Sequence, residues 1–217
     1  MPSHTYSQHV RRFAAYSHTA EGRYVRTSGS RLSRRWTHRS RSARDTDRLG
    51  YLIGRSLRGG EIIALYGDLG SGKTALVRGM AAGVEAPHRD VSSPTFVLIH
   101  TYHGRLPLVH ADLYRLQSIL ELRELGLHAY FDGHHVIAIE WAEKAGHELP
   151  SDILKIHLSH VSRTTRFIDF DATGPQSSRL LNRVIKAHNQ SKSISKSRRV
   201  VEPHDSRSQS ASHPNRL

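Results

Sequence analysis

The sequence contains no cysteine, and this absence excludes several kinds of chemistry at once. Disulfide scaffolds, thiolate zinc sites and cysteine nucleophiles all require a residue that the chain lacks. Long apolar runs are missing as well. The longest clean one, Ile62–Leu65, is far shorter than the roughly 20 apolar residues of a membrane-spanning helix. We therefore expect a soluble protein that performs no thiol redox chemistry and enters no membrane.

Acidic residues are scarce at both ends of the chain, and this scarcity explains the formal net charge of +13. Residues 1–44 contain ten arginines and one acidic residue, and residues 186–217 contain seven basic and two acidic residues. The block between them contains 15 basic and 16 acidic side chains, so it is almost neutral. The excess positive charge therefore belongs to the two ends.

Both basic ends are rich in serine, arginine and histidine and lack a sustained apolar period. Such segments cannot bury enough apolar surface to offset the entropy lost on ordering. We expect a disordered N-terminal extension over 1–44, a folded domain over 45–186 and a disordered C-terminal tail over 187–217. An organelle-targeting peptide is an alternative for the N-terminal extension, and contact with nucleic acid is a further possibility for the basic tails.

The central block alternates β-rich and helix-forming stretches. The predicted strands are Glu61–Tyr66, Phe96–Tyr102, Leu106–Ala111, His135–Glu140, Ile153–Leu158 and Thr165–Phe170. The predicted helices are Asp45–Leu57, Ala75–Gly83, Gln117–Leu127 and Gln176–His188. This order of elements predicts an α/β fold with a central, largely parallel sheet.

One segment matches the phosphate-binding motif G-x-x-x-x-G-K-[ST] without a mismatch. It lies between a predicted strand and a helix that begins at Ala75, and its residues are Gly67, Asp68, Leu69, Gly70, Ser71, Gly72, Lys73 and Thr74. Glycines let backbone N–H groups approach phosphate oxygens, because they carry no Cβ atom. Lys73 is expected to reach the β- and γ-phosphates, and the Thr74 hydroxyl to ligate Mg²⁺. The motif predicts a P-loop NTPase-like three-layer fold.

A P-loop enzyme needs a further acidic group near Mg²⁺, and two predicted strands end in a carboxylate. Asp112 follows one apolar run, and Glu140 ends another directly before Trp141. In open α/β sheets, ligands bind outside the carboxyl ends of the strands. We expect Asp112 and Glu140 to face one metal ion and one water molecule, although either alone could be a strand-end cap.

A loop and a histidine lie close to these carboxylates in the sequence. The segment Ser92–Phe96 occupies the place where P-loop enzymes carry a nucleotide-sensing loop, and Thr95 is its candidate Mg²⁺ ligand or γ-phosphate sensor. A generic Ser-Pro turn is the alternative. His110 shares a strand face with Asp112, because the two residues are two positions apart. A lone histidine of this kind favours packing or hydrogen bonding over metal binding.

Taken in order, these motifs resemble the TsaE (YjeE) family, P-loop ATPases of bacterial tRNA threonylcarbamoyladenosine modification. The resemblance covers residues 45–172 and rests on Gly67–Thr74, Ser93–Phe96, His110–Leu116, Ile139–Trp141 and Leu149–Pro150. It implies a bacterial cytoplasmic, Mg²⁺-dependent ATPase that works with TsaB and TsaD on tRNAs reading ANN codons. By position, Thr95 would be the switch threonine, Asp112 and Glu140 the metal and water carboxylates, and Trp141 an aromatic residue of the nucleotide site or a partner surface.

Two other classes of P-loop protein, GTPases and small-molecule kinases, are alternatives to this resemblance. A GTPase should carry Asn-Lys-x-Asp to recognise guanine, and the sequence has no such motif. A small-molecule kinase is the stronger rival, because the P-loop alone would suit it. Such kinases usually carry an arginine-rich lid, whereas the region between Glu140 and Arg163 offers only Lys144 and Lys155.

Overall fold

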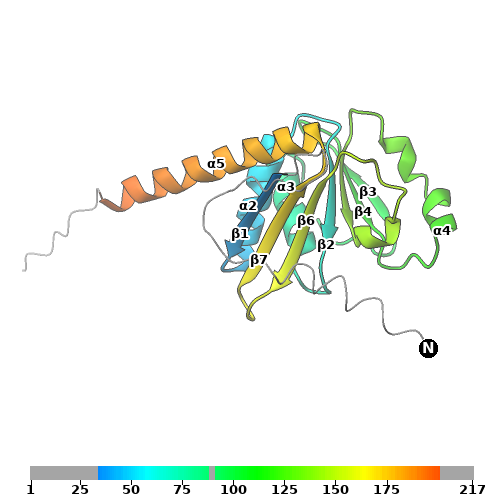
Figure 1. Cartoon of the computed structure of the whole chain (residues 1–217), viewed down its shortest axis with the longest axis horizontal. Coiled ribbons are helices and arrows are strands. Elements are labelled where there is room, and N and C mark those ends of the chain that lie inside the picture. Colours follow the sequence, from blue (N-terminus) through cyan, green and yellow to red (C-terminus); the bar gives the residue numbers. More distant parts are fainter. Residues whose placement is uncertain (1–33, 88–90, 201–217) are drawn as a thin grey trace, which may run out of the picture.

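The computed structural model of the chain describes residues 34–87 and 91–200, which form a three-layer α/β domain (Figure 1). The sheet strands are β1 (Arg34–Ser40), β2 (Ile62–Tyr66), β3 (Ile99–Tyr102), β4 (Leu108–Asp112), β5 (Val136–Glu140), β6 (Leu154–His160) and β7 (Arg166–Ala172). The helices are α2 (Ala43–Ser56), α3 (Lys73–Gly83), α4 (Ile119–Glu124) and α5 (Pro175–Val200), with 3₁₀ turns η1 (Leu127–Tyr130) and η2 (Ala142–Ala145).

The strand order in the sheet is β1-β7-β6-β2-β5-β4-β3. The four central strands β6, β2, β5 and β4 pair in parallel, whereas the pairings of β1, β7 and β3 with their neighbours are antiparallel. Antiparallel strands thus flank a parallel centre. The predicted P-loop NTPase-like α/β architecture is confirmed.

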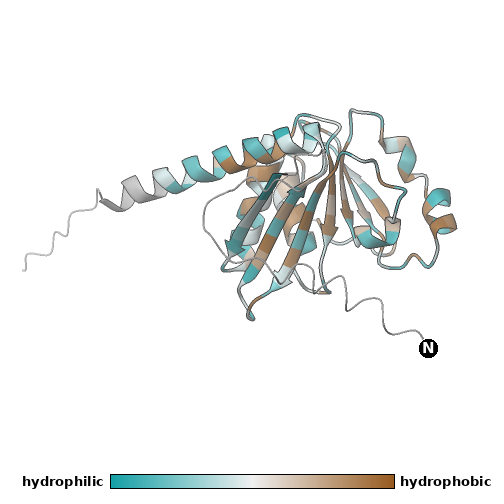
Figure 2. Cartoon of the chain, in the orientation of Figure 1, coloured by the Kyte–Doolittle hydropathy of each residue, from teal (hydrophilic) through white to brown (hydrophobic). Residues whose placement is uncertain are grey.

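Two apolar clusters hold the layers together, one on each face of the sheet. On β2, Ile63 and Leu65 join the cluster that contains α2, α3 and α5, whereas Ile62 and Ala64 join the cluster that contains α4, η1 and η2. Successive strand residues point to opposite faces, so a strand covered on both sides must be apolar throughout. Figure 2 shows this as hydrophobic colour along the central strands. The continuous apolar run before the P-loop is therefore the middle of the sheet.

The predicted domain start at residue 45 is wrong, because part of the expected disordered extension is folded. Strand β1 pairs with β7 along its whole length, and Ser42 caps α2 by accepting a hydrogen bond from the Asp45 backbone N–H. The arginines in β1 concealed an alternating pattern in which Trp36 contacts Phe170, with ring centroids 5.0 Å apart. Composition alone misses such a pattern, since Arg35 and Arg39 lie on the other face and Arg34 shares the face of Trp36. Residues 1–33 lie outside the described part.

We expect Trp36→Ala to lower the free energy of unfolding of the full chain by about 2–3 kcal/mol, because the ring is half-buried and its removal leaves a cavity. Trp36→Phe should cost less, since it keeps a ring against Phe170. Urea unfolding measures both values. If Trp36→Ala were as stable as the wild type, β1 would be a peripheral strand, and a domain start at residue 45 would again be tenable.

The predicted C-terminal boundary at residue 186 is also wrong, because α5 continues to Val200. No glycine or proline interrupts the sequence between Pro175 and Val200, and the buried His188 packs edge-on against Trp36. The packed domain therefore extends past the expected start of the tail. In the part of the chain that the structure describes, neither α5 nor any other helix is long and apolar enough to cross a membrane.

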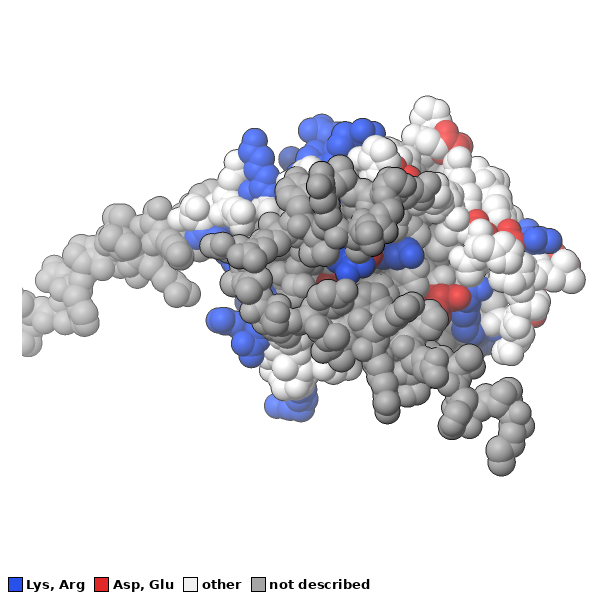
Figure 3. Space-filling model, in the orientation of Figure 1, with Lys and Arg blue, Asp and Glu red and all other residues white. Residues whose placement is uncertain are grey.

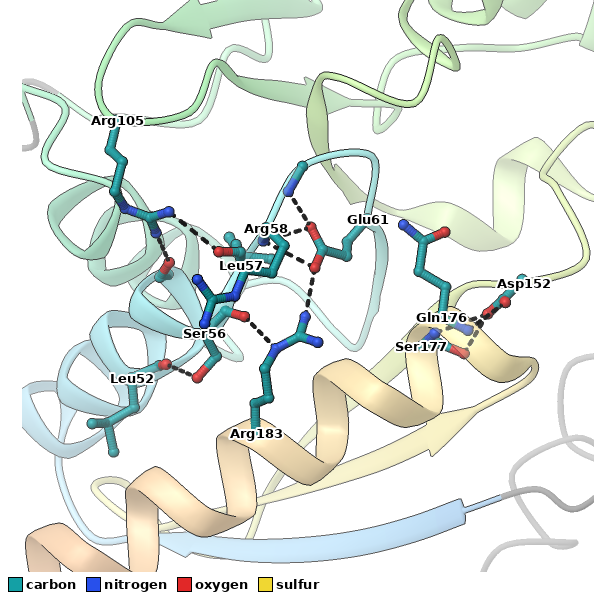
Figure 4. A network of polar contacts seen from close by, with 12 residues as sticks. Leu52, Ser56, Leu57, Arg58, Glu61, Arg105, Asp152, Gln176, Ser177 and Arg183 are labelled. Carbon is teal, nitrogen blue, oxygen red and sulfur yellow. Dashed lines mark hydrogen bonds and ion pairs between the residues drawn. The ribbon is translucent and has the colours of Figure 1, made fainter.

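An ion pair between the partly buried Arg183 and the buried Glu61 holds α5 against the rest of the domain (Figure 4). Arg183 of α5 donates to Glu61 Oε1 at 2.7 Å and to the Ser56 carbonyl at 2.7 Å. Glu61 also accepts hydrogen bonds from the backbone N–H groups of Arg58 and Gly59, so its carboxylate is well paired although only 3% exposed. These contacts fix α5 against the turn that leads into β2.

The contact between α5 and β1 makes stability depend on pH. Burial, with a smaller contribution from His38, lowers the pKa of His188 from its usual 6.5 to about 4. Asp45 opposes this shift, whereas Lys192 and Arg48 add to it. Because the folded-state pKa is depressed, the unfolded chain binds a proton that the folded chain rejects between pH 6.5 and 4. Stability is therefore complete above pH 6.5 and falls as the pH drops through this window.

We expect the free energy of unfolding to decrease by about 1–2 kcal/mol between pH 7.5 and pH 4.5 on account of His188. His188→Phe should remove this part of the pH dependence, whereas His134→Phe, at an exposed loop position, should keep it. Urea unfolding of the three chains at both pH values provides the measurement. An equal slope for wild type and His188→Phe would mean that His188 does not titrate in this range.

Candidate active site

The P-loop connects β2 to α3 at the carboxyl edge of the parallel strands. Gly67 and Gly72 adopt φ angles of 135° and 107°, which side chains other than glycine rarely allow. A Cβ atom at Gly67 would lie 2.3 Å from the Leu158 carbonyl oxygen, so the loop needs glycine there for space as well. The loop leads into α3, which begins at Lys73. The N-terminus of this helix directs its positive end into the site.

An arginine that is distant in the sequence forms a hydrogen bond with the backbone of the P-loop. Arg166 of β7 donates from Nε to the Ser71 carbonyl oxygen at 2.7 Å. Within the described residues, the buried Ser71 hydroxyl has no hydrogen-bond partner. Sequence reasoning missed Arg166, because an isolated arginine 95 residues beyond Ser71 carries no local signal of this contact.

Lys73 is only 4% exposed, and its ammonium group lies inside the loop. Its Nζ donates to the Gly67 and Asp68 carbonyl oxygens at 2.7 and 3.1 Å. The same atom lies 3.9 Å from the centre of the Trp141 ring, in a cation–π arrangement. Burial lowers the pKa of Lys73, and the nearby carboxylates, Glu140 first, oppose this effect. The lysine is thus a desolvated cation held among oxygen acceptors.

Glu140 at the end of β5 meets the P-loop directly. The Thr74 hydroxyl donates to Glu140 Oε1 at 2.8 Å, and the Glu140 side chain is almost fully buried. The same oxygen lies 2.9 Å from His110 Nε2. The structure therefore brings together the P-loop threonine and one of the two predicted carboxylates.

Asp112 lies beside Glu140, because β4 and β5 are parallel and pair these two residues in register. Asp112 is 2% exposed, and its Oδ2 accepts a hydrogen bond from the Thr95 hydroxyl at 2.7 Å. Ser93 also donates to Asp112, and the Tyr114 backbone N–H donates to the other carboxylate oxygen. The predicted sensing loop and the predicted carboxylate are thus joined. The sequence motif that includes Ser93 does not by itself indicate that its hydroxyl contacts Asp112.

Trp141 closes the site on the side of Glu140. It adopts a left-handed φ of 57° immediately after β5, and its ring lies 4.9 Å from that of Tyr114. The Leu69 side chain, by contrast, is 76% exposed at the tip of the loop, so the loop contributes its backbone there. Lys144 donates to the carbonyls of Tyr114 and Leu116 and fixes the segment after Asp112.

These groups fit a magnesium-bound nucleoside triphosphate. A buried ammonium, a helix N-terminus and a glycine-rich backbone suit phosphate, and a hydroxyl with two carboxylates suits a hard cation. Among the described residues, no three histidine, cysteine or acidic side chains form a complete metal cage.

Comparison with known proteins gives a consistent result. The family model for "Threonylcarbamoyl adenosine biosynthesis protein TsaE" matches residues 40–168. The tRNA threonylcarbamoyladenosine biosynthesis protein TsaE of Treponema pallidum is 43% identical over 119 residues, which cover 55% of this chain and 87% of the relative. The corresponding Bacillus subtilis protein is 38% identical over 131 residues, 60% of this chain and 81% of the relative.

A solved structure supports the same relationship at the level of the fold. The crystal structure of Bacillus subtilis YdiB superposes with a TM-score of 0.60 and 29% sequence identity. The match covers 72% of this chain and 98% of that chain. The family match begins at Ser40 and therefore leaves most of β1 outside it, together with all of α5.

Proposed function

The chain belongs to the TsaE family of tRNA threonylcarbamoyladenosine biosynthesis proteins, and from this we propose that it binds and hydrolyses ATP with Mg²⁺. The observation that carries the proposal is the contact of P-loop Thr74 with Glu140, beside the buried Lys73. Two segments remote in sequence, the P-loop with the start of α3 and the end of β5, supply the cation, the hydroxyl and the carboxylate that phosphoryl chemistry needs.

Each residue has a distinct part in this proposal. Lys73 would exchange its two loop carbonyls for the β- and γ-phosphate oxygens, which carry more negative charge. Thr74 would turn an oxygen lone pair to the metal, and Thr95 would report the γ-phosphate through its hydrogen bond to Asp112. Asp112 and Glu140 would hold the metal and orient the attacking water. Bound Mg²⁺ would neutralise the phosphate charge that develops during transfer.

We further propose that hydrolysis depends on TsaB and TsaD and serves modification of tRNAs that read ANN codons. The assignment rests on the family, whose named role is threonylcarbamoyladenosine biosynthesis, and the bacterial relatives favour the cytoplasm as its location. A small-molecule kinase remains the second candidate by motif alone. No observation in the described residues favours it, because the segment after Glu140 forms η2 and β6 and carries only Lys144 and Lys155 as lysine or arginine residues before Arg163.

ATP consumption separates the two candidates. The purified chain should hydrolyse ATP slowly alone and at least about tenfold faster with TsaB–TsaD, since the partners would complete the site. ATP consumption by a metabolite kinase would not depend on TsaB–TsaD and would require a phosphate acceptor. Release of inorganic phosphate, followed with and without the partners, distinguishes these results.

The basic residues of α5 support a contact between this helix and tRNA when the chain works with TsaB and TsaD. The segment 175–200 contains seven basic residues and no acidic one. Among its described side chains, Arg179, Lys186 and Lys192 are exposed, and Figure 3 shows Lys and Arg side chains on the surface near α5. Phosphate backbones bind such surfaces without regard to sequence. We propose that tRNA, brought by the partners, approaches from this side. Residues 201–217 lie outside the described part.

A further inference from the structure

We propose that His110 is a positioning residue that holds the Glu140 carboxylate in its working orientation throughout the nucleotide cycle. The proposal rests on the proposed function for what Glu140 does, but its structural part concerns the free chain. His110 is the middle residue of β4, is fully buried, and lies 2.9 Å through Nε2 from Glu140 Oε1. It is therefore part of the site's support and not merely of the core.

The sheet register explains how this contact arises. His110 pairs in register with Ala138 of β5, two residues before Glu140, and Asp112 pairs with Glu140 itself. Residues two apart on a strand share a face, so His110 lies on the same face as both carboxylates. The small side chain of Ala138 leaves the imidazole unobstructed on its way to the neighbouring strand.

The hydrogen bonds at Glu140 determine which nitrogen of the His110 ring carries a proton. Glu140 Oε1 already accepts from the Thr74 hydroxyl at 2.8 Å, and two donors on one oxygen suit an ionised carboxylate. His110 must then carry its proton on Nε2. The other nitrogen, Nδ1, is buried and has no partner among the described residues. The contacts therefore place a ring proton on Nε2, the atom that donates to Glu140.

This arrangement has a consequence for nucleotide binding. If the Thr74 oxygen ligates Mg²⁺ through a lone pair, its O–H can still donate to Glu140, but the position of this donor then follows the P-loop and its ligand. His110 then remains as the donor that fixes Glu140, because it belongs to a sheet strand and not to the loop. Small misplacements of a reacting group cost large factors in rate. We expect loss of the His110 N–H to slow the chemical step and to leave nucleotide affinity nearly intact.

Two substitutions separate hydrogen bonding from packing. His110→Gln places an amide N–H near the position of Nε2, whereas His110→Leu fills space without a donor. In single-turnover hydrolysis with TsaB–TsaD, His110→Leu should be at least about tenfold slower, with ATP affinity within about threefold. His110→Gln should recover most of the rate. His100→Leu is the matched control, because His100 faces His110 in the β3–β4 register but is exposed and has no contact with Glu140.

In a Glu140→Gln background, His110→Leu should add little further loss, since the two residues act as a unit. If His110→Leu hydrolysed ATP at the wild-type rate, or if His110→Gln were as slow as His110→Leu, the positioning role would be refuted.

The position of the proton on the His110 ring can be tested without an activity measurement. Two-bond ¹⁵N–¹H correlation spectra of the free chain, with His110 assigned from the signals that His110→Gln removes, should show a proton on Nε2. A ring protonated on Nδ1 alone would overturn the inference even if ATP is hydrolysed. Conversely, an Nε2–H ring in a wild-type chain that hydrolyses no ATP would count against the proposed function and leave the structural part of the inference standing.

Discussion

Replacement of Glu140 or Asp112 by alanine is expected to abolish most ATP hydrolysis, with rates reduced at least about a hundredfold. The two carboxylates end adjacent parallel strands in register, and each is hydrogen-bonded to a hydroxyl group of the site, Thr74 for Glu140 and Thr95 for Asp112. In the proposed mechanism, loss of either carboxylate would remove a metal or water contact, and it would release the partner hydroxyl. Phosphate release in the presence of TsaB–TsaD measures the effect.

The double variant should be little worse than either single one, because groups that serve the same metal and water are not independent. Glu124→Ala is the control, since Glu124 is an exposed acidic residue of α4 away from the P-loop. It should hydrolyse ATP at the wild-type rate. If Glu140→Ala hydrolysed ATP at the wild-type rate, Glu140 would have no role in hydrolysis and the Ile-Glu-Trp stretch would be an ordinary strand end. If the losses of the two single variants added up in the double variant, the two carboxylates would act independently.

The second large effect is expected at Lys73. Lys73→Ala should weaken ATP binding by ten- to a hundredfold, equivalent to roughly 1.5–3 kcal/mol, because it removes a charge-assisted contact to phosphate. The alanine variant should still fold, since the lysine's present partners are loop carbonyls that water can reach once the side chain is gone. Isothermal titration calorimetry with a non-hydrolysable ATP analogue and Mg²⁺ gives the affinity directly.

A lysine outside the site provides the comparison for this variant. Lys155 lies on β6, paired in register with Ala64 and not with the P-loop, so Lys155→Ala should bind the analogue as the wild type does. A Lys73→Ala chain with unchanged affinity would show that phosphate is bound without the P-loop lysine, and the motif would then be a glycine-rich turn before a helix.

The sequence predicted those parts of the site that depend on local pattern. The P-loop is a contiguous motif, and the apolar runs before Asp112 and Glu140 are strands buried on both faces, so their ends could be placed at one edge of the sheet. Thr95 was found because its loop precedes one of these strands. The structure brings Thr95 to Asp112 and Thr74 to Glu140, while the functional roles of these residues stay predictions.

The features that sequence reasoning missed depend on contacts between distant segments. Arg166 braces the P-loop only because β7 returns beside β6, and no pattern around it indicates this. Strand β1 was not predicted, because its three arginines outnumber Trp36, its one large apolar residue. His110 was seen as a hydrogen-bonding candidate, but its partner could be identified only from the register of β4 and β5.

Formation of the modified nucleoside in a reconstituted reaction tests the central claim most directly. TsaB, TsaD, ATP, the substrates of threonylcarbamoyl transfer and a tRNA that reads ANN codons are combined with the wild-type chain, with Lys73→Ala or with no addition. Repeated rounds of threonylcarbamoyladenosine formation should require the wild-type chain and should be lost with Lys73→Ala. Sustained modification without the chain, or at the wild-type rate with Lys73→Ala, would contradict the claim that ATP bound at this P-loop drives the reaction.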